Sequence, residues 1–551
     1  PGEPNHHIAG TGGFRGLRSR LLGERGCSEQ KTRPCKVSAA AQQPGFLDFV
    51  GCAAAPTTTA PTTAPTATTT QPTVTTQETT LIDMTEDPYT VAIQVVVLPG
   101  TNFAGREDRE AAINAITLPA INAKVQIQEV WISQLRNTTS LAVAGGEKVD
   151  ILHVGTVMRL SSIVGADLLH DMNEDDLLNT RGRYLVDLFG DTLLSAGSAG
   201  GRQLAVPAQT FNARALGLYY NKTFADQHAI RVPENMVFED LIGILRQVKM
   251  VDSEMMPYFS GRGHLNHIQN LVSYESFGNL SAYGVIFDPM NDSTLVNLFA
   301  SEQYRDYAMM MQRLTAEGLQ PGDPTDTNPH QAYFNAGKLF CVVGETTERG
   351  RATIQAAAGD IEVGWIQLVD PVINNDSLTQ FMWGIATNSE RPDKAMDFLS
   401  YMFENPEVAN ILTYGLENTD HEFVTGSNSI VRRIPGTYAP TFFRGGNIED
   451  MLILYPNGAD FITNVKATEA QASVSPHLGY MFDDSAFQTE AAVLNSTILE
   501  FIPRINNGMA ESPAAMQALL DEFNAKLRLS GIEDVIRANQ EQIDAYLRAQ
   551  G

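Results

Sequence analysis

Three tryptophans offer flat apolar rings, which can stack against the apolar face of a ligand such as a sugar ring. Trp131 ends the expected strand over residues 124–131, and in a parallel sheet ligands gather beyond the carboxyl ends of the strands. We therefore expect Trp131 to be a stacking platform, with core packing as the alternative. Trp383, in the apolar segment 381–386, has the same two interpretations, and Trp365 is predicted to lie in the core.

Further candidates stand next to expected strand ends and chain reversals, where side chains can hydrogen-bond the hydroxyl groups of a ligand. They are Gly155, Thr156, Gln209, Tyr220, Asn221 and Glu345. Gly155 has no side chain, so a ligand could approach its backbone closely, although a simple turn would use the same residue. Tyr220 could equally pack against its neighbours, and Glu345 could be a solvated surface carboxylate.

The familiar sequence motifs of enzymes are missing. The chain contains no Gly-x-Ser-x-Gly, no His-Glu-x-x-His, no phosphate loop and no Gly-x-Gly-x-x-Gly after a strand. We therefore predict no catalytic residue, no cofactor and no metal. His264 and His267 could bind a metal together, but no third ligand stands beside them, so surface or loop positions are expected. Paired carboxylates for glycoside hydrolysis stay open, because that geometry is not readable from a sequence.

The charge of the chain is unevenly distributed. Residues 1–86 hold seven Lys/Arg and seven Asp/Glu, so the whole formal charge of -26 falls on residues 87–551. Such an acidic surface repels phosphate backbones and anionic lipid headgroups, which disfavours nucleic acid and membrane surfaces as partners. The length of 551 residues predicts two or more domains.

Four cysteines are too few for a disulfide framework, and only Cys341 lies beyond the first 86 residues. Cys341 sits in an apolar run that predicts a buried strand, where a free thiol behaves as a small apolar group. Cys52 follows Gly51 and precedes a Thr/Pro/Ala-rich tract over residues 53–80, which resembles the cleavage site and tether of a bacterial lipoprotein. Asp48 and Phe49 depart from that pattern. We expect residues 1–86 to be a disordered leader and tether.

The elements that would position these residues begin at Tyr89. Apolar and alternating patterns predict strands over residues 89–98, 124–131 and 149–154, with helices over 108–118 and 134–145 between them. Strands that alternate with helices predict a parallel sheet with right-handed crossovers, and so an α/β fold.

The C-terminal part carries an ordered set of motifs. Ser475-Pro-His-Leu-Gly-Tyr-Met-Phe-Asp483 is followed by Glu490, then Asn524-Ala-Lys-Leu527, then Asn539-Gln-Glu-Gln-Ile-Asp544. This order resembles the extracytoplasmic solute-binding proteins of ABC importers (family 1), in their LipO-like lipoprotein branch. Weaker matches extend the resemblance over nearly all of residues 89–546. They lie at residues 201–207, 215–222, 233–246, 333–344, 392–402 and 412–417.

The resemblance implies a two-lobed, type II periplasmic-binding-protein-like fold with a hinge and extra C-terminal helices. Lobe 1 would hold residues of about 88–207 plus a return segment near 380–430, and lobe 2 about 222–375 plus the C-terminal segments. Gln209, Tyr220 and Asn221 would then lie near the lobe junction, and Glu345 would replace a tryptophan that family members often place there.

The function that the resemblance implies is capture of a carbohydrate, an oligosaccharide in this family, between the lobes and its delivery to the transmembrane subunits of an ABC permease. The protein would be an extracytoplasmic monomer, at the cell surface or in the periplasm, with Cys52 as a possible lipid anchor. Two alternatives stay open: a binding protein for peptides or other small polar solutes, and a surface glycosidase.

Overall fold

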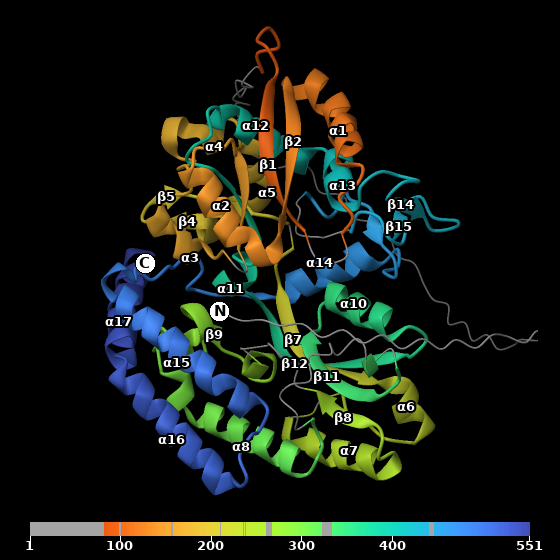
Figure 1. The fold of residues 1–551 in the computed structure, drawn as a ribbon, viewed down its shortest axis with the longest axis vertical. Coiled ribbons are helices and arrows are strands. Elements are labelled where there is room, and N and C mark those ends of the chain that lie inside the picture. Colours follow the sequence, from red (N-terminus) through yellow and green to blue (C-terminus); the bar gives the residue numbers. More distant parts are fainter. Residues whose placement is uncertain are drawn as a thin grey trace, which may run out of the picture. The chain divides into compact units, whose positions relative to one another are not determined.

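The computed structural model divides into two units, Pro1–Thr76 and Gln77–Gly551. It describes residues 82–550 apart from 98–100, 156–157, 210, 235, 237, 260–266, 322–332, 335 and 440–445. The fold below is therefore that of the second unit (Figure 1).

One sheet of this unit has the strand order β2-β1-β3-β13-β6. Its strands are β1 (Tyr89–Val97), β2 (Ala123–Trp131), β3 (Ile151–Val154), β6 (Val206–Pro207) and β13 (Met382–Ile385). Strand β1 runs parallel to β2 and β3, which confirms the predicted parallel sheet. Strand β13 returns from a distant part of the chain and pairs antiparallel with β3 and β6.

Helices cover both faces of this sheet. The main ones are α1 (Arg106–Ile121), α2 (Leu135–Ala144), α3 (Leu160–Ile163), α4 (Leu177–Thr180), α5 (Arg183–Leu194), α12 (Pro392–Glu404) and α13 (Pro406–Tyr414). Val95 of β1 packs in a core with residues of α1, α5, α12 and α13, whereas the next residue, Val96, packs with α2 and α3. Successive side chains of a strand point to opposite faces of the sheet. Because Val95 and Val96 are both apolar and both packed, β1 is buried on both faces.

A second sheet has the order β17-β12-β7-β11-β8. Its strands are β7 (Arg214–Asn221), β8 (Met256–Phe259), β11 (Leu339–Glu345), β12 (Val363–Ile373) and β17 (Ser473–Val474). Strand β7 pairs antiparallel with β11 and β12, and β11 runs parallel to β8. Cys341 lies in β11 with 1% of its surface exposed, which confirms the predicted buried strand.

Helices also pack against this second sheet, and three of them come from the C-terminal end of the chain (Figure 1). They are α6 (Lys222–Gln227), α7 (Phe238–Val251), α8 (Glu302–Ala316), α10 (Glu348–Ala358), α15 (Gln488–Asn506), α16 (Pro513–Leu529) and α17 (Ile532–Gln550). Phe501 of α15 stacks on Phe523 of α16 with ring centroids 4.8 Å apart. The predicted C-terminal helices are thus part of the core around the second sheet.

Within the described ranges, three segments of the chain cross between the two sheets. The first joins Pro207 at the end of β6 to Arg214 at the start of β7. The second leaves β12 at Ile373 and reaches β13 through the short helix α11 (Asn375–Leu378). The third runs from a three-stranded sheet, β14 (His421–Phe423), β15 (Ile430–Arg433) and β16 (Ile453–Leu454), through α14 (Phe461–Gln471) into β17.

Some predicted boundaries differ from the observed ones. The pattern of residues 233–246 predicts an amphipathic helix, and the observed helix begins at Phe238. The apolar end of residues 201–207 predicts one strand, but the structure has two short strands, β5 (Arg202–Gln203) and β6, because Arg202 and Gln203 turn back to pair with β4 (Ser198–Ala199).

Candidate functional site

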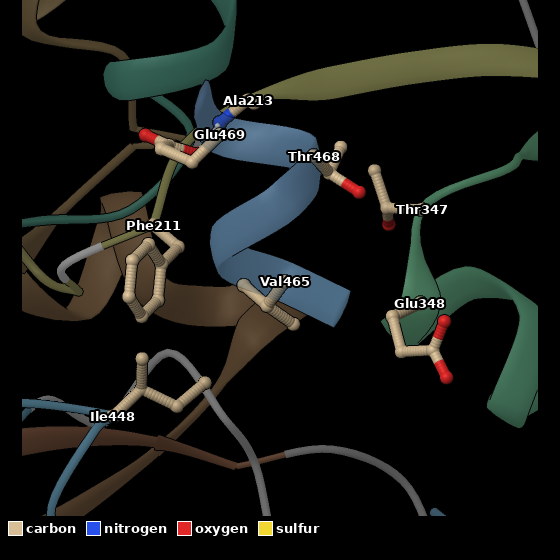
Figure 2. A pocket seen from close by; sticks show the side chains of 8 residues that line it. All are labelled: Phe211, Ala213, Thr347, Glu348, Ile448, Val465, Thr468 and Glu469. Carbon is tan, nitrogen blue, oxygen red and sulfur yellow. Dashed lines mark hydrogen bonds between the residues drawn. The ribbon is translucent and has the colours of Figure 1, made fainter. Parts of the chain in front are cut away.

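An open hollow, about 310 Å³ when the space open to solvent is included, lies beside the first and third crossing segments (Figure 2). It is lined by Phe211, Ala213, Thr347, Glu348, Ile448, Val465, Thr468 and Glu469. These residues come from the first crossover, from the junction of β11 and α10, from the approach to β16 and from α14. The carboxyl end of β11 therefore opens into the hollow, as expected for a ligand site in an α/β fold.

One wall of the hollow is apolar. The ring of Phe211 lies against Val465 and Ile448, in a cluster that also contains Phe461 (Figure 2). Helix α14 presents Val465 and Phe461 on one side because residues four apart share a helix face. A flat ring in an apolar setting is the kind of surface on which the apolar face of a pyranose stacks.

The opposite wall is polar. Strand β11 ends at Glu345, and Thr347 and Glu348 open helix α10. The Thr347 hydroxyl donates to the Glu345 carboxylate, and the Glu348 carboxylate accepts from Arg351. Glu348 also accepts from Asn464 Nδ2 of α14 at 3.4 Å, so this bond links α10 to α14 beside the hollow. Carboxylates and hydroxyls in this arrangement can bind the hydroxyl groups of a ligand.

Glu469 fixes the position of the first crossover. Its carboxylate accepts from the backbone N–H of Asn212 at 3.1 Å and of Ala213 at 2.8 Å. Bonds from N–H groups to a charged oxygen are stronger than neutral ones. Because Phe211 directly precedes these two residues, Glu469 holds the backbone that carries the aromatic wall.

Tyr219 holds the end of β11 in place through a hydrogen bond. Its hydroxyl donates to the backbone oxygen of Glu345. Burial, and then the charge of the Glu345 carboxylate, raise the pKa of Tyr219, so the phenol stays neutral and keeps its donor. Gly350 must lack a side chain, since a Cβ there would lie 1.9 Å from the Glu345 oxygen.

Trp365 is not a core residue, and that prediction was wrong. Its side chain is 43% exposed, and the Arg351 guanidinium lies 4.4 Å from the centre of its ring. The reason is the alternation of β12, in which Gly364 and Ile366 face inward and Trp365 faces outward.

Trp383 has the opposite outcome. It is fully buried in the core of the first sheet and makes an edge contact with His153 at 4.8 Å between ring centroids. A ring with no exposed surface offers no face to a ligand, so the core interpretation replaces the platform interpretation.

Trp131 ends β2 as expected, and it is half-buried. The ring of Phe103 meets it edge-on at 5.0 Å, and Phe103 is 38% exposed. The two rings form an aromatic pair at the carboxyl end of the first sheet. This pair keeps Trp131 as a candidate platform.

Gly155 is needed for a contact within the protein. Its φ of 127° is a conformation that favours glycine, and a Cβ would lie 2.1 Å from the backbone oxygen of Gln380. The close approach expected for a ligand is thus made by the second crossover. Thr156 lies outside the described residues.

The predicted position of Tyr220 and Asn221 near the junction was wrong. Strand β7 begins at the first crossover, and these two residues close its far end, about 20 Å away at 3.3 Å per residue. Asn221 caps helix α6 by accepting from the N–H of Phe224 at 2.8 Å. Gln209 is nearer the hollow: it is buried in the first crossover, and its backbone oxygen accepts from Asn212.

His267 is neither a surface nor a loop residue, contrary to expectation. It is fully buried, and its two ring nitrogens lie 2.8 Å from the hydroxyls of Tyr258 and Tyr307. His264 and Cys52 lie outside the described residues. Within the described ranges, no group of three or more His, Cys, Asp or Glu side chains could hold a metal ion. In the same ranges, no helix has the length and apolar character needed to cross a membrane.

A second hollow of about 670 Å³ lies where the loop after β3 meets α11 and the C-terminal segment 479–482. Arg159 and Asp376, 3.7 Å apart, stand among its lining residues. Its aromatic residues Phe277, Tyr283, Tyr480 and Phe482 are each at most 8% exposed. They therefore offer little ring surface, and the first hollow is the better candidate site.

Sequence reasoning missed Phe211, Glu348 and Glu469. Glu348 had a signal, since it follows a predicted strand by three residues. Phe211 and Glu469 had no such signal in the sequence. Phe211 lies in the first crossing segment and Glu469 in the third, so they meet only in the folded chain.

Comparison with known proteins agrees with this fold. Residues 476–548 match the family described as "Domain of unknown function (DUF3502)". A "Carbohydrate ABC transporter substrate-binding protein" of Streptococcus pneumoniae is 24% identical over 451 residues, which are 80% of this chain and 87% of that protein.

Two solved structures illustrate the likeness of fold. The N-glycan transport solute binding protein NgtS of Streptococcus pneumoniae matches 84% of this chain and 100% of its own, with a TM-score of 0.72 at 20% identity. The substrate binding protein FusA of S. pneumoniae, solved with kestose, matches the same shares with a TM-score of 0.56 at 13% identity. The chain therefore has the two-lobed solute-binding fold, and its similarity to a carbohydrate ABC transporter substrate-binding protein confirms the resemblance drawn from its C-terminal motifs.

Proposed function

We propose that this protein captures a carbohydrate outside the cytoplasm and delivers it to an ABC permease. The observation that carries the proposal is the hollow beside the crossovers, which sets the Phe211 ring opposite Thr347 and Glu348. An aromatic face together with directed hydrogen-bond partners is the combination that a sugar ring requires.

The relatives support the same ligand class. NgtS has been solved with Man1GlcNAc and FusA with kestose. Both ligands are oligosaccharides, and an oligosaccharide is therefore the class that we propose for this chain. The alternative of a peptide or other small polar solute has no comparable support in the hollow.

We propose binding without chemical conversion. The relatives described above are named as binding proteins. In the hollow, Glu348 is bound to Arg351 and Glu469 to two backbone N–H groups, so both carboxylates already have structural partners. A surface glycosidase remains the competing function, and release of a smaller sugar during incubation is the result that would establish it.

Capture would work by a shift between open and closed states. A ligand that is seated in the hollow and also contacts lobe 1 binds the closed state better and so raises its population. We keep the lobe boundaries as part of the proposal: residues of about 88–207 and 380–430 in one lobe, and about 222–375 with the C-terminal segments in the other.

The site of action follows from this function. An extracytoplasmic monomer at the cell surface or in the periplasm, held by a lipid on Cys52, would present the sugar to the permease subunits. Mass spectrometry of membrane-extracted protein should find diacylglyceryl on Cys52. An unmodified chain that begins upstream of Cys52 would reject the anchor.

The test of the function is a thermal-shift screen with mono- and oligosaccharides, amino acids and peptides, followed by calorimetry. A saccharide at 100 times its Kd should stabilise the protein by about 2.7 kcal/mol, and mass spectrometry should recover it unchanged. Stabilisation only by peptides or amino acids, or by no compound of the panel, would refute carbohydrate capture.

A further inference from the structure

We infer that the hollow selects uncharged saccharides and discriminates against saccharides that carry carboxylates. This inference rests on the proposed function and adds the charge of the ligand to it. Among the described lining residues, Glu348 and Glu469 are carboxylates and none is a lysine or arginine. Glu345 adds a third carboxylate beside Thr347.

In the part of the chain that the structure describes, two cations beside the hollow, Arg351 and Lys466, already have carboxylate partners. Arg351 contacts Glu348 and also lies 4.4 Å from the centre of the Trp365 ring. Lys466, on the same helix as Val465 and Glu469, pairs with Glu449. An anionic ligand would have to compete with Glu348 or Glu449 for these cations, whereas a neutral sugar can leave both pairs intact.

The N-terminus of helix α10 does not make up for the lack of free cations among the described residues of the hollow. The N-terminus of a helix attracts anions through its free N–H groups and its dipole. Here Glu348 occupies the first turn, so the protein's own carboxylate takes that stabilisation. Glu348 and its neighbours instead offer acceptors to hydroxyl groups, and a bond from a hydroxyl to a carboxylate is charge-assisted.

The net charge of the whole protein also disfavours an anionic ligand. The formal charge of -26 slows the approach of an anion, and this effect weakens as salt is added. A single repulsion between two carboxylates across a partly solvated hollow corresponds to a discrimination of about tenfold.

The experiment measures Kd by calorimetry for matched pairs, with EDTA present to exclude cation bridges. The probes are mannotetraose against mannuronate tetramer and galactotetraose against galacturonate tetramer. The same panel includes 1-kestose, chitotetraose and maltotetraose. We expect one or more neutral sugars to bind, and each uronate to bind at least about tenfold more weakly than its neutral partner or not at all. The penalty should shrink from 0.05 to 0.5 M salt, measured on the same pairs.

The variant Glu348→Gln tests the residue itself. It should reduce the ratio of the uronate Kd to the neutral Kd by about threefold or more, because it removes the charge of one lining carboxylate and keeps the shape of the side chain. Glu533→Gln, which removes one exposed carboxylate at the start of α17, is the matched control and should change nothing. Thermal unfolding checks that both variants are folded.

The two possible failures are distinct. A uronate that binds wild-type protein as tightly as its neutral partner, or a ratio that Glu348→Gln leaves unchanged, would overturn the charge selection and leave carbohydrate capture standing. If no saccharide of either charge binds, the proposed function fails, and this inference fails with it.

Discussion

Phe211 is the residue on which the apolar wall of the hollow depends. Phe211→Ala should weaken saccharide binding by about 1 to 3 kcal/mol, because a stacked ring and its buried area are lost. Phe211→Leu keeps much of the apolar volume and removes the flat ring, so calorimetry on both variants separates stacking from simple burial. Equal affinity of Phe211→Ala and wild type would show that the sugar does not contact this wall.

Trp131 is the second aromatic candidate at the residue scale. Because its ring is half-buried and pairs with Phe103, Trp131→Ala should also weaken binding by about 1 to 3 kcal/mol if the ligand reaches the end of β2. Unchanged affinity by calorimetry would confine the ligand to the hollow beside α14.

Glu469 acts through the backbone that it holds. Glu469→Ala removes the acceptor for two N–H groups of the first crossover, which should destabilise the protein by about 1 to 2 kcal/mol. It should also lower saccharide affinity, since Phe211 loses its fixed position. Chemical denaturation and calorimetry measure the two effects, and Glu469→Gln, which keeps one acceptor oxygen, should recover part of both.

At the scale of elements, the C-terminal helices contribute to the stability of the core around the second sheet. Phe523 of α16 is fully buried between Phe501 and Phe299. Phe523→Ala should cost about 3 to 5 kcal/mol of unfolding free energy, through lost burial and the cavity left behind. Leu529→Ala, on the same helix but 90% exposed, is the control and should change stability by less than about 0.5 kcal/mol. Similar denaturation midpoints for both variants would contradict this role of α16.

A charge cluster joins α7 to the end of α8. Hydrogen bonds from Arg246, at 2.6 Å, and from Arg313 lower the pKa of Glu317 to about 2. A carboxylate with a lowered pKa in the folded state adds stability above its ordinary pKa, and that stability is lost as the pH falls toward 2. Arg246→Gln should raise the Glu317 pKa toward 4.5, as read by an NMR titration, and its stability difference from wild type should vanish at low pH. The effect on stability should be small, because the cluster faces solvent. A Glu317 pKa that stays near 2 would assign the shift to Arg313 alone.

At the scale of the whole molecule, the proposed function requires motion between the lobes. Small-angle scattering should show a smaller radius of gyration when a binding saccharide is added, and no change with a sugar that does not bind. Because the three crossing segments must bend during closure, hydrogen exchange should also slow around residues 207–214 on binding. A bound sugar that leaves both measurements unchanged would contradict capture by closure.

The sequence by itself determined the local elements and the order in which they occur. Apolar alternation predicted β1, β2 and β3 and their parallel pairing, and the run around Cys341 predicted a buried strand. The C-terminal motifs predicted the solute-binding fold. These features follow from short-range periodicity and from ordered motifs, both of which can be read along the chain.

Only the tertiary structure decided which residues meet. The hollow joins the segments 211–213, 347–348 and 448–469, which lie a hundred or more residues apart. Periodicity carries no information on such contacts, so Glu469 could not be paired with Asn212 from the sequence. For the same reason the core prediction for Trp365 was wrong, and the sequence could not decide between the two interpretations of Trp383: whether a ring on a strand faces solvent depends on which helices cover that face of the sheet.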